Sequence, residues 1–426
     1  MIDVVEALRR VEKAAVGSQP RRVRIENAVG MQLREDVISD TDSPPWHRSM
    51  MDGFAVLSSD FALTEDDKQV VTLDVVAEIG AGETTAIILK RGQCIRIMTG
   101  APMPTGADAV IPIERVVPGS SDGLTGEHVS LHDSHFRFGQ HVSKKASFFH
   151  KGQTVIHSGV ELEPVHIGLA AEVGVSHVTV NAPPRVSIIT TGNELISDCK
   201  IPGKGQIRNT NEPMLAAAVV RCGAEPIPMG IAKDHAESLR ALMAQGLAAD
   251  LLLLSGGVSA GDYDLVPRIL EKMGVECIFH KVCMKPGKPI WFGVFQRPEA
   301  SPTLVFGLPG NPVSALVCFE LFVRPALGVV SGRSLVMQSG PHHTAKLIGS
   351  VSGDRDRPVY HPCHLELAEG GFLAEALPWG GSADLLGLSR ANGLLVLPKN
   401  CGDYHKDDSV EVVPLVSRFR YESERC

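Results

Sequence analysis

The stretch Asp250-Leu-Leu-Leu-Leu-Ser-Gly-Gly-Val-Ser-Ala-Gly-Asp-Tyr-Asp264 carries the clearest structural signals in the chain. Four consecutive leucines between turn signals predict a short strand that is buried on both faces, as strands of parallel sheets are. A loop rich in glycine follows, and a helix carrying Leu265, Ile269 and Leu270 is expected after it. The stretch therefore predicts a strand, a glycine loop and a helix in succession.

Such a loop at a helix start favours an anionic ligand, because glycines let the backbone approach and free N–H groups attract phosphate. Ser255 and Ser259 add hydroxyl groups to this loop. Asp262 and Asp264 place two acids at the same helix start. The combination indicates either a phosphate bound together with a divalent cation or acid chemistry beside a phosphate. The simpler alternative is that one of the two aspartates is only an N-cap.

Length and composition indicate a globular protein of several domains. The 426 residues exceed one ordinary core, so about two to four domains are expected. The net charge is −8, which disfavours nucleic acid as a partner of the whole surface. None of the nine cysteines forms a Cys-x-x-Cys pair, which favours reduced thiols over a zinc or redox pair. We expect no signal peptide, no apolar run of membrane-spanning length and hence a cytoplasmic protein.

The first half of the chain predicts a helix followed by mainly β structure. Asp3 is expected to cap a helix that ends near Ala15, with Val5, Leu8 and Val11 on one face. Short β-like segments separated by glycines follow between residues 44 and 139. Two motifs in this region are compatible either with ligand binding or with simple turns. They are Asp52-Gly53 before an apolar strand, and the proline-rich loop that begins at Thr99-Gly100.

From Val186 onward the pattern changes to strand–loop–helix units, which predict a parallel sheet. Asp234 with Glu237 resembles a capping box, and Asn311-Pro312 is a well-placed helix start. Loops that leave the carboxyl ends of parallel strands gather at one edge, where ligands bind. We expect this edge to carry Glu194, Asp234, Ser255–Asp264, Lys285, Lys288 and Ser314. The two lysines would serve an anion, or else belong to a solvated turn.

Separated segments that span nearly the whole chain together resemble the molybdopterin molybdenumtransferase family, MoeA and the gephyrin E domain. The matching segments, in order, are Ser49-Met-Met-Asp-Gly-Phe-Ala55, Met98-Thr-Gly-Ala-Pro102, Ala107-Asp-Ala-Val110, Thr191-Gly-Asn-Glu-Leu195, Ser255-Gly-Gly-Val-Ser-Ala-Gly261, Lys285-Pro-Gly-Lys-Pro289, Gly307-Leu-Pro-Gly-Asn-Pro-Val-Ser-Ala315 and Ala391-Asn-Gly-Leu-Leu-Val-Leu-Pro398. The glycine loop also occurs in related pterin-binding proteins, whereas the full set is highly specific.

The resemblance implies an α/β plus β architecture of four domains. These are a discontinuous α+β domain (residues 1–43 and 140–181), an inserted β domain (44–139), a Rossmann-like molybdopterin-binding domain (182–330) and a small C-terminal β domain (331–426). It also implies a homodimer in which the two subunits share the active cleft. A molybdopterin adenylyltransferase would act upstream.

The activity implied by the resemblance is insertion of molybdate into adenylylated molybdopterin, with release of AMP and a need for Mg²⁺ or another divalent cation. Asp52, Asp234 and Asp264 would be catalytic, and Asp262 and Asp264 would hold the metal. The positions implied to bind the pterin nucleotide are Thr99, Glu194, Ser255, Gly256, Gly257, Ser259, Gly261, Asp262, Lys285, Lys288 and Pro309. Those implied to bind molybdate are Lys288, Pro289, Ser314, Arg357 and Ser382.

The chain departs from the family pattern at one place. The family carries Arg-x-x-Gly-Glu-Asp where this chain has Ala146-Ser-Phe148, and the family's aspartate there affects catalysis. The insertion step would then be slower, use another carboxylate or be lost. Three hypotheses follow: an active insertase, a non-catalytic molybdopterin-binding paralogue that acts as a carrier or assembly partner, and an unrelated nucleotide-binding enzyme. The last leaves the Ser-Met-Met-Asp-Gly and Lys-Pro-Gly-Lys-Pro segments unexplained.

Overall fold

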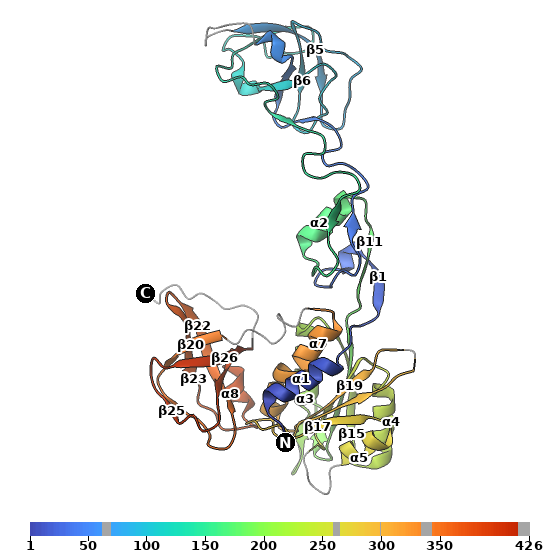
Figure 1. Cartoon of the computed structure of the whole chain (residues 1–426), viewed down its shortest axis with the longest axis vertical. Coiled ribbons are helices and arrows are strands. Elements are labelled where there is room, and N and C mark those ends of the chain that lie inside the picture. Colours follow the sequence, from blue (N-terminus) through green and yellow to red (C-terminus); the bar gives the residue numbers. More distant parts are fainter. Residues whose placement is uncertain (62–69, 259–264, 299, 334–342, 416–426) are drawn as a thin grey trace. The chain divides into compact units, whose positions relative to one another are not determined.

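The computed structural model describes residues 1–61, 70–258, 265–298, 300–333 and 343–415, and these divide into two compact units (Figure 1). Unit 1 comprises residues 1–35, 158–163 and 177–426, and unit 2 comprises residues 36–157 and 164–176. Each unit has hydrophobic clusters of its own, and each is described separately below.

The centre of unit 1 is a six-stranded sheet with the order β15-β12-β16-β19-β18-β17. Its first four strands run parallel, and β18 runs opposite to both of its neighbours, β19 and β17. The prediction of a parallel sheet is therefore correct for the first four strands and wrong for the two pairings that β18 makes. The strands are β12 (Arg185–Thr191), β15 (Glu225–Ala232), β16 (Leu251–Ser255), β17 (Glu276–His280), β18 (Trp291–Phe295) and β19 (Thr303–Leu308).

Helices cover both faces of this sheet, which explains the run of leucines in β16. Leu251 and Leu253 pack in one hydrophobic cluster with α1, α3, α6 and α7, whereas Leu252 and Leu254 pack in another with α4 and α5. All four leucines are fully buried, as predicted. The helices are α1 (Val4–Ala14), α3 (Asn211–Arg221), α4 (Ala236–Gly246), α5 (Leu265–Lys272), α6 (Pro312–Cys318), a π-helical turn (Phe319–Val323) and α7 (Arg324–Val330).

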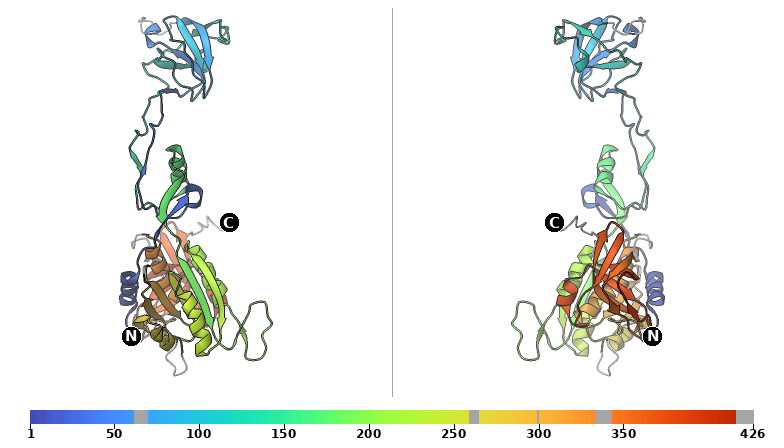
Figure 2. Two further views of the ribbon diagram at one scale, coloured as in Figure 1. Left: turned by 90° about the vertical axis from the view of Figure 1, so that its right-hand side faces the viewer. Right: turned by 90° about the vertical axis from the view of Figure 1, so that its left-hand side faces the viewer.

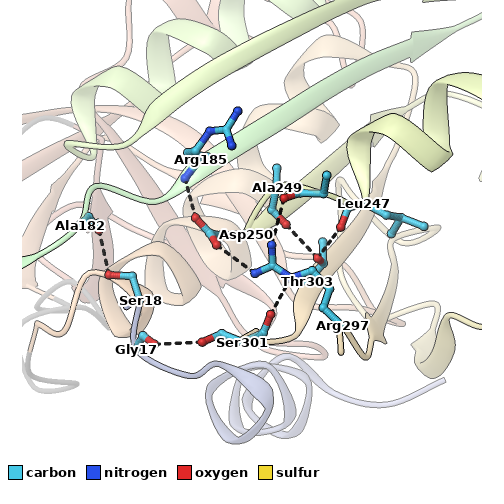
Figure 3. A network of polar contacts seen from close by, with 11 residues as sticks. Gly17, Ser18, Ala182, Arg185, Leu247, Ala249, Asp250, Arg297, Ser301 and Thr303 are labelled. Carbon is cyan, nitrogen blue, oxygen red and sulfur yellow. Dashed lines mark hydrogen bonds and ion pairs between the residues drawn. The ribbon is translucent and has the colours of Figure 1, made fainter. Parts of the chain in front are cut away.

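The amino ends of the parallel strands are tied by a polar network (Figure 3). Asp250 accepts hydrogen bonds from the Arg185 backbone N–H at 2.9 Å and from Arg297 Nη2 at 3.1 Å. Thr303 Oγ1 lies 2.8 Å from the backbone oxygens of both Leu247 and Ala249. The network connects the first residues of β12, β16 and β19 to one another, at the edge of the sheet opposite to the cleft described below.

We predict that Asp250→Ala lowers the free energy of unfolding by about 1–3 kcal/mol, because the Arg185 N–H and the Arg297 guanidinium lose an acceptor. Urea denaturation followed by fluorescence measures the change. Asp198→Ala is the control, since the exposed Asp198 side chain accepts a hydrogen bond from the neighbouring Ser197 hydroxyl and makes no other polar contact within the described residues. Equal midpoints for Asp250→Ala and the control would contradict the assignment.

A closed barrel of five strands, β20-β23-β22-β24-β26, forms the last part of unit 1, drawn in orange and red in Figure 2. A sheet closed in this way leaves no open edge. Its strands are β20 (His343–Ile348), β22 (Val359–Ala368), β23 (Gly371–Ala376), β24 (Gly393–Leu397) and β26 (Ser409–Pro414). The smaller elements of unit 1 are β1 (Pro20–Arg24), a 3₁₀ turn (Ile25–Asn27), β11 (His177–Asn181), β13 (Leu195–Ile196), β14 (Ile207–Arg208), β21 (Val351–Ser352), α8 (Leu385–Ser389) and β25 (Asp403–Tyr404).

Unit 2 is built on a five-stranded sheet with the order β7-β4-β6-β5-β8. Its strands are β4 (Gly53–Val56), β5 (Val71–Ile79), β6 (Gln93–Ile97), β7 (Ala109–Pro112) and β8 (His128–Leu131). Two short ribbons accompany it: β2 (Val37–Ile38) with β10 (Thr154–Ile156), and β3 (Arg48–Ser49) with β9 (Val142–Ser143). Helix α2 (Pro164–Glu172) and two 3₁₀ turns (Ser58–Asp60 and Ile113–Arg115) complete the unit.

Three local predictions need correction. Asp3 caps α1 as expected, but the buried residues of the helix are Ala7 and Val11, and Val5 is exposed. The buried face of α1 is therefore shifted from the predicted one. The N-cap of α4 is His235 rather than Asp234, because the Asp234 carboxylate accepts a hydrogen bond from the Asn193 backbone N–H instead of from α4.

The third correction concerns the continuous helix Pro312–Val330, whose 19 residues are long and apolar enough to cross a membrane. This differs from the prediction that the chain has no apolar run of membrane-spanning length. In the folded chain 83% of this segment is buried, as in the core helix of a globular protein. At its centre Glu320 is 1% exposed and forms ion pairs with Arg221 and Arg324. Burial raises the pKa of Glu320, and the two arginines oppose that rise.

Candidate functional site

A cleft of about 1210 Å³ opens at the carboxyl ends of the parallel strands. Its walls include Thr190 and Thr191 at the end of β12, residues 255–258 after β16, and residues 309–312 after β19. A cleft at this edge is the common ligand site of open α/β sheets. The described part of the glycine loop, residues 255–258, therefore lies at the edge where the sequence predicts it.

Two glycines of the loop after β16 are required by its geometry. Gly256 has φ +95°, and a Cβ atom there would lie 2.6 Å from the Thr191 backbone oxygen. Gly257 has φ +66°, and a Cβ atom there would lie 2.9 Å from Val266 Cγ2. Because both positions line the cleft, their missing side chains leave the backbone open to a ligand.

Ser255 is placed beneath the cleft by a buried network that the sequence did not reveal. Its hydroxyl group donates to the Pro309 backbone oxygen at 3.3 Å and accepts from Asn211 Nδ2 at 2.7 Å. Asn211 Nδ2 also donates to the Gly310 oxygen at 2.7 Å. The Ser255 hydroxyl is thus used to join two loops of the cleft. The only sequence signal for Asn211 was a polar residue opening an otherwise apolar helix.

Two buried oxygen atoms of cleft residues lack a hydrogen-bond partner among the described residues, Asn211 Oδ1 and Thr191 Oγ1. The orientation of the Asn211 side-chain amide is set by its contact with the Gly310 backbone oxygen. Because a backbone oxygen can only accept a hydrogen bond, the amide nitrogen Nδ2 must face it. Buried polar atoms are normally satisfied. Their presence in the cleft wall therefore supports a polar rather than an apolar ligand.

Two predicted carboxylates, Glu194 and Asp234, line this cleft. Asp234 Oδ2 accepts the Asn193 backbone N–H at 3.0 Å, and the Asp234 N–H lies 3.3 Å from Asn193 Oδ1. This reciprocal pair joins the loop after β12 to the loop after β15. It holds Asp234 in the cleft wall and explains why the residue does not cap α4.

Lys285 and Arg357 meet at Asp354, on the contact between the 283–289 loop and the barrel. Lys285 Nζ lies 3.1 Å from Asp354 Oδ2. Asp354 Oδ1 accepts the backbone N–H groups of Asp356 and Arg357 at 2.9 and 3.2 Å. The Asp356 N–H and the Lys285 ammonium lower the pKa of Asp354 to about 2. The sequence predicts no role for Asp354.

Pro289 lines the cleft, and Lys288 beside it is exposed. Ser382 reaches the start of α6, where its hydroxyl accepts from Asn311 Nδ2 at 2.7 Å and its backbone oxygen from the Val313 N–H at 3.2 Å. Asn311 occupies the predicted N-cap position, but this bond diverts its side chain from capping. Ser314 is buried in α6.

Asp52 and Thr99 contact each other in unit 2. Asp52 Oδ1 accepts from the Thr99 backbone N–H at 2.7 Å and from Thr99 Oγ1 at 2.6 Å. These two hydrogen bonds, the hydroxyl one first, lower the pKa of Asp52. The aspartate is therefore ionised at neutral pH and more than a simple turn residue.

The segment Ala146–Phe148, where the resemblance implies Gly-Glu-Asp, carries no acid and begins in a left-handed conformation. Ala146 has φ +59°, a left-handed conformation that favours glycine. Its N–H donates to the Pro44 oxygen at 2.9 Å, and Phe148 is exposed. The preceding residue, Lys145, pairs through Nζ with Asp42 Oδ2 at 3.3 Å. An alanine thus occupies the left-handed position of this turn, and residues 146–148 supply no carboxylate.

Ser259, Gly261, Asp262 and Asp264 lie outside the described residues. Within the described ranges, no group of three or more His, Cys, Asp and Glu side chains could hold a metal ion. The eight cysteines of those ranges are free, and four of them, Cys94, Cys222, Cys318 and Cys363, are buried. Burial raises the pKa of the Cys222 thiol to about 11, so it is protonated at neutral pH.

Comparison with known protein families identifies the family of this chain. Residues 2–174 match the MoeA N-terminal region (domain I and II), residues 187–328 a probable molybdopterin binding domain, and residues 344–415 the MoeA C-terminal region (domain IV). The molybdopterin molybdenumtransferase of Bacillus subtilis is 33% identical over 97% of this chain and 94% of its own length. The chain belongs to the molybdopterin molybdenumtransferase family.

Other relatives agree with this family assignment. The molybdopterin molybdenumtransferase of a Nostoc species is 36% identical over 87% of this chain and 83% of its own. A molybdopterin biosynthesis MoeA protein from Pyrococcus horikoshii has a solved structure that is 30% identical, with a TM-score of 0.79 over 98% of this chain and 100% of that one. The predicted family and fold class are confirmed. The relatives' names favour an enzyme of molybdenum cofactor biosynthesis over the non-catalytic alternative.

Proposed function

We propose that this member of the family inserts molybdate into adenylylated molybdopterin and releases AMP. The observation that carries the proposal is the cleft itself. It combines a backbone surface at Gly256 and Gly257 with two carboxylates, Glu194 and Asp234, and with the cationic 285–289 loop beside it.

The pyrophosphate linkage of the pterin nucleotide fits the glycine loop, because free backbone N–H groups attract phosphate oxygens. Mg²⁺ is usually held by one or two carboxylates together with phosphates and waters, so Asp234 and Glu194 suit it. The predicted ligands Asp262 and Asp264 follow the same loop and would complete the set. Bound there, the cation would stabilise charge that develops on the leaving phosphate.

Molybdate is repelled by carboxylates and needs cations and hydroxyl groups. Lys288, Arg357, Ser314 and Ser382 supply these at the far side of the cleft from Asp234 by our proposal, with Pro289 between them as a rigid wall. Ser382 supports this division, since its bond to Asn311 brings the C-terminal loop to the start of α6. Oxyanion and pterin nucleotide would thus occupy separate parts of one site.

Asp52 and Thr99 remain to be assigned, and we propose that they act across a homodimer, each unit 2 serving the cleft of the partner subunit. An ionised Asp52 suits contact with a metal or a hydroxyl nucleophile. We further propose the four domain ranges given above, action in the cytoplasm, and supply of the substrate by a molybdopterin adenylyltransferase.

The decisive experiment incubates the purified protein with adenylylated molybdopterin, molybdate and Mg²⁺ and follows AMP. Release of AMP that requires molybdate supports the insertase. Tight binding of the pterin nucleotide without AMP release would favour the carrier.

Lys288→Ala is predicted to weaken molybdate binding about tenfold, because one charge-assisted hydrogen bond contributes about 1.5 kcal/mol. Binding of the pterin nucleotide should be nearly unchanged. Titration calorimetry with each ligand separates the two, and Lys399→Ala, which removes an exposed lysine from a turn of the barrel, is the control. An equal loss of both affinities would refute the division of the cleft.

A further inference from the structure

Lys285 is not free to meet an anion in this structure, because it is already paired with a carboxylate. The Lys285 Nζ to Asp354 Oδ2 distance is 3.1 Å, and the side chain of Asp354 is 19% exposed. The pair joins the 283–289 loop to the barrel, next to backbone bonds from Lys285 N–H to the Pro358 oxygen and from Tyr360 N–H to the Lys285 oxygen. The ammonium group therefore sits on a fixed backbone beside a fixed negative charge.

The two oxygens of Asp354 have separate tasks. Oδ1 accepts two backbone N–H groups and so shapes the turn that carries Arg357, whereas Oδ2 faces only Lys285 among the contacts of the described chain. Shaping the turn needs an acceptor but no charge. An asparagine would perform that task equally well, so the turn alone does not account for a carboxylate at this position.

We propose that Asp354 is an internal counter-ion that occupies Lys285 until an oxyanion arrives, and that it thereby sets the affinity of the site and its discrimination by charge. This inference rests on the proposed function and extends it, because it adds Lys285 to the cations that attract molybdate. Asp354 does not touch the substrate in this proposal. It is a positioning residue that acts through Lys285.

The expected size follows from Coulomb's law. An oxyanion held by the same ammonium group lies about 6 Å from Asp354, since each contact is about 3 Å. In water the repulsion at that distance lowers the affinity of a dianion about tenfold and of a monoanion about threefold. Salt weakens both effects, because the Debye length at physiological ionic strength is about 8 Å. Asp354 therefore opposes a dianion more strongly than a monoanion.

The test is Asp354→Asn, which keeps an acceptor for the Asp356 and Arg357 N–H groups and removes the charge. Equilibrium dialysis of the full chain with molybdate, and separately with the tetrahedral monoanion perrhenate, measures the affinities at low and at physiological salt. We expect Asp354→Asn to bind molybdate about tenfold more tightly at low salt and perrhenate about threefold, with smaller gains at higher salt. Asp354→Glu should restore the affinity toward that of the unchanged protein.

Glu6→Gln is the matched control, because it removes one negative charge and the ion pairs with Arg9 and Arg10 on α1. It should leave both affinities unchanged. Equal or weaker molybdate binding by Asp354→Asn, with an unchanged thermal transition, would overturn the counter-ion and leave a structural ion pair. If the unchanged protein binds the pterin nucleotide but neither oxyanion, the proposed function itself fails, and the inference falls with it.

Discussion

Asp234→Asn should lower the rate of AMP release by about 10²–10³-fold while the protein remains folded, a loss typical of removing one group that stabilises transition-state charge. Asp234 lines the cleft, and its carboxylate is held by the Asn193 N–H. Asparagine can still accept that N–H through its oxygen. The substitution therefore removes the charge and keeps the connection between the two loops.

Glu237→Gln provides the control for Asp234→Asn. Glu237 lies in the first turn of α4, three residues along the chain, and its removal changes the net charge equally. Single-turnover assays of AMP release at saturating Mg²⁺ compare the two variants with the unchanged protein. A rate for Asp234→Asn within threefold of the control would show that Asp234 only connects the two loops and takes no part in catalysis.

Gly53→Ala should have the largest effect on stability, about 3 kcal/mol or more, because the clash is with backbone atoms that cannot move aside. A Cβ atom at Gly53 would lie 2.0 Å from the Ile111 oxygen and 2.9 Å from Pro112 Cα. Gly53 pairs with Pro112 where β4 meets β7, directly after Asp52. The substitution would push β4 away from β7 and displace the Asp52–Thr99 contact.

Thermal unfolding and limited proteolysis of unit 2 report this effect. Gly168→Ala in α2 of the same unit is the control, since a Cβ atom there meets nothing within 4 Å. Alanine at this helical position should stabilise by about 0.5–1 kcal/mol. A Gly53→Ala protein as stable as that control would show that β4 and β7 can move apart at little cost in free energy.

The sequence predicted the central sheet because its signals are local. Leu251–Leu254 lies between turn signals, and four leucines in a row predict a strand that is buried on both faces. All four side chains are fully buried in the structure. The antiparallel edge of β17 and β18 was missed because strand direction depends on how the connection crosses the sheet. Residue pattern alone does not contain that information.

The site could be predicted only in part, for a similar reason. Glu194, Asp234 and Gly256 follow strands, so the common edge of a parallel sheet places them together. Asn211 and Asp354 were missed because their partners, Ser255 and Lys285, lie far along the chain. The proposed capping role of Asp234 was wrong because a tertiary hydrogen bond from Asn193 outcompeted a local one.

The buried Glu320 has a consequence for the synthesis of the chain. Before it packs, Pro312–Val330 is an apolar segment of 19 residues that insertion machinery would test as a membrane span. Arg324 adds about 2.5–3.5 kcal/mol against insertion at the helix centre, and Glu320 is a further ionisable group in the same region. The ion pairs that Glu320 and Arg324 form in the folded core thus come from the same residues that make the unfolded segment a poorer membrane span.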